Sequence, residues 1–203
     1  MRRSALILSG GRTVLMLAAL AASALARAGS QERIAPPPQA AGGPGLSLRS
    51  PGFAPGDVIS SSEVFDRGGC RGGNSSPALQ WSHPPAGTRS FALLLYDSDA
   101  PGGFWHWAVF DIPARVRSLQ SGAGDPAKHL LPSGAIQVRN DFGSLGYGGP
   151  CPPPGPPHHY HLMLYALRHA KLGLGVDASP ARVADRARAD SLAEAQLVGR
   201  YAR

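Results

Sequence analysis

The sequence lacks a hydrophobic run of the length that crosses a membrane comfortably. Residues 13–25 form an almost wholly apolar stretch of only 13 residues, whereas a transmembrane helix needs about 20. The preceding residues carry three arginines and no acid, and Ala-Arg-Ala at 26–28 places small residues at the −3 and −1 positions of a cut after Ala28. These features predict a secretory signal peptide over residues 1–28 rather than an uncleaved anchor, and hence a periplasmic or secreted protein with no integral membrane segment after cleavage.

Cysteine is also scarce. The chain contains two cysteines, Cys70 and Cys151, and an even, low number in an exported protein favours one disulfide bond. Two alternatives stay open on the residues alone. The cysteines could be free thiols, or Cys151 could be a nucleophile beside His158, which would require a free thiolate.

The excess of basic residues belongs largely to the signal segment. The formal net charge is +7, but four arginines fall within residues 1–28, which leaves sixteen basic against thirteen acidic residues in the mature chain. This balance gives no reason to expect a nucleic-acid partner. Residues 29–45, rich in Pro, Gly, Ala and Gln, predict a flexible leader, and residues 46–203 are long enough to form one domain with a full core.

Long helices are disfavoured by 26 glycines and 20 prolines. One helix is predicted, with Ser179 as N-cap, Pro180 at its first position, and Val183, Ala184 and Ala187 on one face. Residues 193–202 fit either a last strand or the tail of that helix. Four segments have the length and composition of strands, and two of these are apolar on both faces, as in the interior of a sandwich. The strand segments are residues 91–97, 106–112, 135–139 and 160–167, of which the first and last are the doubly apolar ones. The sequence therefore predicts a mainly β fold of two packed antiparallel sheets with a peripheral C-terminal helix.

Recognised catalytic motifs are absent: there is no Gly-x-Ser-x-Gly elbow, no phosphate-binding Gly-rich loop with Lys-Ser/Thr, and no tight metal-ligand spacing. The residues that could carry chemistry instead flank one turn, where Asp97 ends a strand and His106 begins the next. In antiparallel strands these two side chains lie at the same end of the sheet. Alternation along the later strand places His158 and Tyr160 together with Leu162 and Leu164, whereas His159, His161 and Met163 face away.

Alternation likewise predicts that His106 shares a face with Ala108, Phe110 and Ile112, opposite Trp105, Trp107 and Val109. One carboxylate, two imidazoles and a phenol gathered in this way suit an oxyanion. A neighbouring carboxylate raises the pKa of an imidazole, so that a protonated histidine donates both N–H groups, and charge-assisted bonds to phosphate oxygens are strong. Phe104 and Trp105 are candidates for an apolar or cation–π wall.

Other interpretations of the same residues stay open. A histidine beside tryptophans can be an ordinary core residue, and Asp97 and Asp99 can simply cap the turn. Asp97, Asp99, His106 and His158 are also acceptable zinc ligands. The prolines of residues 151–160 are expected to stiffen a loop that walls the site.

Several segments resemble those of phosphatidylethanolamine-binding proteins, in particular the bacterial members called Raf kinase inhibitor-like proteins. The two signature segments are YDSDAPGGFWHWAVFDIPA (96–114) and GYGGPCPPPGPPHHYHLMLYAL (146–167), with further similar blocks at 69–93 and 131–143. The resemblance implies a β-sandwich with an anion pocket at one end. By position, the family's ligand-binding residues fall on Asp97, Ala100, Pro101, His106, Pro152, His158 and Tyr160.

The resemblance also implies a function. It indicates a non-enzymatic protein, without a cofactor, that binds a small phosphorylated ligand or a phospholipid head group. The alternative is an interaction module that inhibits a kinase or protease partner, with the pocket as its docking or regulatory site. A Cys70–Cys151 disulfide fits exported-looking members, and a cis peptide is expected between Ala100 and Pro101.

The sequence departs from the family pattern at three places. Ser98 replaces a proline between Asp97 and Asp99, and His159 stands where an arginine is usual. The turn between Pro101 and His106 is about two residues shorter than in many bacterial members, so we expect one wall of the site to be more open.

Overall fold

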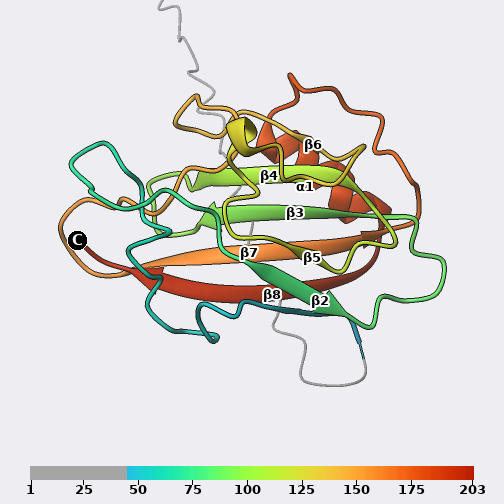
Figure 1. Ribbon diagram of the computed structural model, residues 1–203, viewed down its shortest axis with the longest axis horizontal. Helices are drawn as coiled ribbons and strands as arrows, with labels where there is room; N and C mark the ends of the chain where they lie inside the picture. The colour runs from blue at the N-terminus through green and yellow to red at the C-terminus, as the bar shows by residue number, and fades with distance from the viewer. Residues whose placement is uncertain (1–44) are drawn as a thin grey trace, which may run out of the picture. The chain divides into compact units, whose positions relative to one another are not determined.

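The computed structural model describes residues 45–203, which form two antiparallel sheets and one α-helix (Figure 1). The predicted signal peptide and nearly all of the predicted leader lie outside the described residues. The smaller sheet has the strand order β1-β2-β5, and the larger has the order β6-β4-β3-β7-β8. The strands of the smaller sheet are β1 (Ser47–Arg49), β2 (Leu79–Ser82) and β5 (Ser118–Leu119); those of the larger are β3 (Ser90–Asp97), β4 (Phe104–Pro113), β6 (Ile136–Gln137), β7 (His158–Leu167) and β8 (Ser191–Tyr201). The predicted mainly β fold with two antiparallel sheets is confirmed.

The main core lies on the face of the larger sheet that carries every second residue of β3 and β7. Phe91, Leu93 and Leu95 of β3 pack there with Leu79 and Trp81 of the smaller sheet. All eight residues of β3 are buried, and only the first two of β7 are not. The two doubly apolar runs are therefore the central strands of the larger sheet, as predicted, because each has a packed layer on both faces.

The helix α1 (Pro180–Asp190) covers the opposite face of the larger sheet. It packs there through Val183, Ala184 and Ala187. The hydroxyl of Ser179 accepts a hydrogen bond from the Arg182 amide at 3.2 Å, which confirms the predicted N-cap. Strand β8 begins at residue 191, directly after the helix. Of the segment 193–202, which fitted either a strand or the helix tail, residues 193–201 are therefore strand and Ala202 lies beyond its end. No helix in the described part of the chain is long and apolar enough to cross a membrane.

Two β-bulges interrupt the pairing of β4 with β3. Leu95 pairs with Trp107 and Tyr96 with Trp105, so His106 has no partner residue on β3. The second bulge lies opposite Ala92, and there Asp111 has a φ of 58°. Each extra residue shifts the alternation of side chains by one position.

The bulges overturn the predicted faces of β4. Ala108 and Phe110 pack under α1, whereas Ile112 and Trp107 lie between the sheets. The predicted set of His106, Ala108, Phe110 and Ile112 on one face is therefore wrong. His106 nevertheless lies on the face of Tyr160, because the first bulge puts His106 and Trp107 on the same side.

Strand β6 is shorter than the predicted segment 135–139. It pairs with β4 only through Ile136 and Gln137. Beyond Gln137 the chain turns into a loop that is bonded to β4 at separate points, including an amide bond from Val138 to the carbonyl of Ala108 at 3.2 Å. That loop carries a residue of the candidate site.

Candidate functional site

Asp97, the last residue of β3, is the centre of a hydrogen-bonded turn. Its Oδ1 atom accepts the amide N–H groups of Asp99 at 2.9 Å and Ala100 at 3.1 Å. Its Oδ2 atom lies 2.7 Å from Nδ1 of His158. The carboxylate is buried and every one of these groups is a donor, so Asp97 holds both the turn and the His158 ring in place.

The register of β7 explains why His158 reaches this carboxylate. Asp97 pairs directly with Tyr160, and His158, two residues earlier, lies on the same face of the strand. His161 and Met163 lie on the other face, where His161 contacts Ser98 at 3.0 Å. The predicted alternation along this strand is confirmed.

The His106 ring is fixed by a backbone carbonyl. Its Nδ1 atom donates a hydrogen bond to the oxygen of Gly148 at 2.7 Å, and its ring centroid lies 5.2 Å from that of Tyr160. Because Nδ1 carries the proton, Nε2 is the nitrogen left for a ligand. We name Asp97, His106, His158 and Tyr160 the imidazole site.

The protonation of His106 differs from the sequence-based expectation. Burial lowers the pKa of His106 to about 4, although the carbonyl of Gly148 and the charge of Asp97 act in the opposite direction. The expected imidazolium beside a carboxylate is therefore wrong for His106 in the free protein. The hydrogen bond of the carboxylate goes to His158 instead, and His106 is a neutral ring enclosed by aromatic side chains.

Tyr160 supplies a buried hydroxyl. The residue is 1% exposed, and its Oη atom makes no hydrogen bond of standard geometry among the described residues, although the Asp97 carboxylate lies close enough to act on it as an acceptor. Burial raises the pKa of Tyr160, and the negative charge of Asp97 raises it further. The phenol therefore keeps its proton and is available as a neutral donor.

An aromatic cluster borders His106, and part of it was missed by sequence reasoning. Phe104 lies 5.0 Å from the His106 ring, as expected of a wall residue, and Phe142 lies 5.4 Å from it. Trp105, the other expected wall residue, packs instead on the opposite face of the sheet against Tyr96 at 4.5 Å. The only signal for Phe142 was its place in the similar block at 131–143, because neither spacing nor alternation relates a loop residue to a strand.

The turn between β3 and β4 differs from the expected form. The peptide between Ala100 and Pro101 is trans, so the expected cis peptide is wrong. The chain reverses through Gly102 and Gly103, whose φ angles of 79° and 77° suit glycine. Ala100 is half-buried and contributes its amide to Asp97, whereas Pro101 is exposed on the turn.

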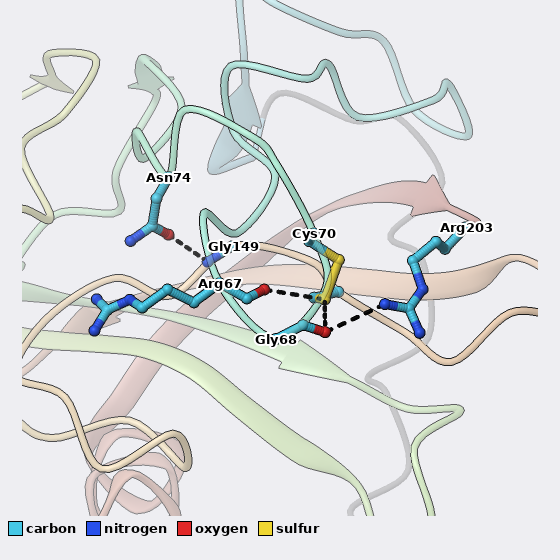
Figure 2. The surroundings of a disulfide bond; sticks show 7 residues. Arg67, Gly68, Cys70, Asn74, Gly149 and Arg203 are labelled. Carbon is cyan, nitrogen blue, oxygen red and sulfur yellow. Dashed lines mark hydrogen bonds between the residues drawn. A yellow bond between two sulfur atoms is a disulfide. The ribbon is translucent and has the colours of Figure 1, made fainter.

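A disulfide bond between Cys70 and Cys151 supports the other side of the site, as predicted (Figure 2). Close to it, the Asn74 side chain accepts the amide N–H of Gly149 at 2.8 Å. These links connect the segment around residue 70 to the segment that carries the Gly148 carbonyl. Pro152 is buried directly after Cys151, and the prolines that follow lead to His158. Because both cysteines are bonded, the Cys151 nucleophile is not available.

The zinc interpretation finds no geometric support. Within residues 45–203, no group of three or more His, Cys, Asp or Glu side chains is placed to hold a metal ion. Asp99 bonds instead to His159, with Oδ2 at 2.9 Å from Nδ1. That pair is exposed and lies at the rim of the turn.

Comparisons with known proteins show the family of this chain. The family model for phosphatidylethanolamine-binding protein matches residues 49–202. UPF0098 protein YbcL of Escherichia coli K12 is 46% identical over 149 residues, which is 72% of this chain and 81% of YbcL. The Mycobacterium tuberculosis H37Rv protein that bears the name "Putative lipoprotein LppC" is 37% identical over 158 residues, covering 77% of this chain and 72% of LppC.

A solved structure extends the similarity to the fold. The crystal structure of E. coli YbcL, described as a new member of the mammalian PEBP family, superposes with a TM-score of 0.76 at 43% identity, covering 78% of this chain and 98% of that one. The chain belongs to the phosphatidylethanolamine-binding protein family.

Proposed function

We propose that this protein binds a small phosphate-containing ligand, such as a phospholipid head group or a soluble phosphate ester, at the imidazole site. The observation that carries the proposal is the convergence of two imidazoles, each held through Nδ1, with the buried Tyr160 hydroxyl, which has no hydrogen bond of standard geometry among the described residues and lies beside Asp97. A buried donor left unpaired costs about 1–3 kcal/mol, and such groups are rare in folded proteins. A ligand oxygen would supply an acceptor with better geometry than the neighbouring Asp97 carboxylate offers.

The two imidazoles support the same ligand class. Each ring is held through Nδ1, His106 by the Gly148 carbonyl and His158 by Asp97, so each keeps Nε2 for the ligand. Once protonated, each Nε2–H forms a charge-assisted hydrogen bond to a phosphate oxygen, which is stronger than a bond between neutral groups. Together with Tyr160, the site then offers three donors to one oxyanion.

The bonding of Asp97 favours binding without catalysis. Oδ1 already accepts two backbone amides and Oδ2 accepts the His158 proton. A general base or nucleophile must itself reach the substrate. In this site the carboxylate acts as a support for the His158 ring rather than as a reacting group.

Calorimetric titration with inorganic phosphate and with phosphoethanolamine tests the proposal. We expect His106→Ala and His158→Ala each to weaken binding by about tenfold or more, since a hydrogen bond to a charged group contributes about 1.5–3 kcal/mol. His169→Ala is the matched control, because this exposed histidine is bonded to Asp190 beyond the far end of β7. Unchanged affinity in both site variants would remove the assignment.

A further inference from the structure

The ring of Phe142 is exposed beside the imidazole site, and phosphate binding alone does not explain an apolar ring at this position. Phe142 is 36% exposed, and its ring is stacked on Phe65 with a centroid distance of 4.2 Å and an interplanar angle of 11°. Phe104 meets it edge to face at 4.6 Å and 62°. Both Phe104 and Phe142 contact the His106 ring, so an aromatic surface runs from the buried imidazole to solvent. We name Phe65, Phe104 and Phe142 the aromatic wall.

The loop that carries Phe142 is braced on both sides. The Asn140 carbonyl accepts the Gly143 amide at 2.9 Å, and the Asn140 side chain donates to the Gly146 carbonyl at 2.9 Å. The Asp141 carboxylate accepts the amide of Trp105 in β4 at 2.8 Å. These bonds hold the turn against the strand that carries His106, so the ring is presented in a fixed position.

Gly148 connects the wall to the imidazole site. Its carbonyl anchors His106, and a Cβ atom on Gly148 would lie 2.6 Å from Cδ2 of Phe142. The absence of a side chain at this position lets the Phe142 ring approach the segment that fixes the imidazole. The wall and the imidazole site thus share one backbone segment.

We propose that the protein prefers phosphate esters in which an aromatic ring is attached directly to the ester oxygen, and that Phe142 determines this preference. The inference rests on the proposed phosphate binding at the imidazole site. Because the wall begins in contact with His106, the first group beyond the phosphate is the one that meets it. An aromatic ring there extends the stacked and edge-to-face packing that the three phenylalanines already make.

A cation of the protein itself already lies against the aromatic wall. The Arg67 guanidinium already lies 5.4 Å from the Phe65 ring centroid, on the same stack as Phe142. The Asp66 carboxylate pairs with this guanidinium at 3.2 Å and offsets its charge, but Arg67 already occupies a cation–π position on Phe65, so a ligand ammonium would have to compete for it. An uncharged ring meets no such cost.

Calorimetry of the folded chain at about pH 6 tests this with phenyl phosphate, phosphoethanolamine and inorganic phosphate. We expect phenyl phosphate to bind about three- to tenfold more tightly than the other two, the range typical of one aromatic pair. Phe142→Ala and Phe142→Leu should both bring the ratio of phenyl phosphate to phosphate affinity close to one. The leucine variant keeps an apolar side chain of similar bulk, so it distinguishes aromatic stacking from apolar contact in general. Leu145→Ala, at an exposed position of the same loop, should leave the ratio unchanged.

The possible failures are distinguishable. If inorganic phosphate does not bind at all, the proposed function is wrong and this inference is wrong with it. If phosphate binds but phenyl phosphate gains nothing, or phosphoethanolamine binds more tightly, the imidazole site stands and the aryl preference is wrong. The role of Phe142 is likewise wrong if Phe142→Leu keeps the full ratio while its thermal unfolding matches that of the parent protein.

Discussion

His106 shows how the surroundings of a single residue determine what it can bind. Its ring is neutral because burial among aromatic rings disfavours the charged form, and its Nδ1 proton is committed to the Gly148 carbonyl. In this state Nε2 accepts hydrogen bonds and does not donate them. A phosphate oxygen is therefore a poor partner until the ring takes up a proton.

Phosphate binding should consequently be coupled to proton uptake at His106. A bound anion favours the imidazolium, so the pKa of His106 is higher in the complex than the value of about 4 in the free protein. Between these two values binding takes up a proton, and affinity should rise as the pH falls through that window. Calorimetry in buffers of different ionisation enthalpy measures the uptake.

A variant distinguishes the proton uptake of His106 from the proton uptake of the phosphate ligand itself. His106→Gln keeps a polar side chain but has no proton to gain, so its proton uptake on binding should be smaller than that of the parent protein by the share of His106. Equal uptake by the two proteins would show that His106 binds the ligand in its neutral form.

At the scale of elements, β7 and β4 differ in how regularly their side chains alternate between the two faces of the sheet. The register of β7 with β3 runs without interruption from Asp97↔Tyr160 to Ser90↔Leu167, and the predicted faces of His158 and Tyr160 follow from that regularity. Strand β4 has two bulges, which no pattern of apolar residues announces. A bulge depends on pairing with the neighbouring strand, and this pairing is a property of the folded sheet.

The helix α1 offers a separate test at this scale. Replacing its N-cap, Ser179→Ala, removes the hydrogen bond to the Arg182 amide and should lower the free energy of unfolding by about 1 kcal/mol. Phosphate affinity should not change, because α1 packs on the face of the larger sheet opposite Tyr160 and His106. Chemical denaturation and calorimetry check the two statements.

Ser133→Ala is the matched control for α1, since Ser133 is an exposed serine in a loop and surface changes of this kind usually stay within about 0.5 kcal/mol. If the Ser179 variant unfolds at the same denaturant concentration as the parent, the cap contributes nothing to stability.

At the scale of the whole molecule, the Cys70–Cys151 disulfide joins segments 81 residues apart. Such bonds persist in oxidising compartments and are rare in a reducing cytosol. We propose that the mature protein acts outside the cytoplasm, as the signal-like residues 1–28 predict. The disulfide (Figure 2) supports this proposal because a bond of this kind would not be expected to persist in a reducing cytosol.

Removing the disulfide tests its contribution to stability, and the state of the two cysteines in exported protein tests the proposed location outside the cytoplasm. The double substitution Cys70→Ser and Cys151→Ser should lower the free energy of unfolding by about 2–5 kcal/mol, because the unfolded chain gains the freedom of a long loop. Protein retained in a reducing cytosol should show two free thiols by mass spectrometry and the same loss of stability, whereas exported protein should show none. Free thiols in the exported protein would contradict both the bond and the proposed compartment.

Much of the architecture is determined by local sequence. The two doubly apolar runs specify the buried central strands, the Ser179-Pro180 pair specifies where the helix begins, and the period of two along residues 158–164 specifies which side chains share the face of Tyr160. These features depend on patterns within one segment. They hold wherever a regular strand or helix has one consistent set of neighbours.

The tertiary structure alone decided the state of the site. Burial by residues distant in sequence made His106 neutral, the pairing of β4 with β3 produced its bulge, and a loop braced on β4 brought Phe142 to the imidazole. The chain could specify these residue types without revealing their environment, because pKa, strand register and ring contacts depend on which segments meet after folding.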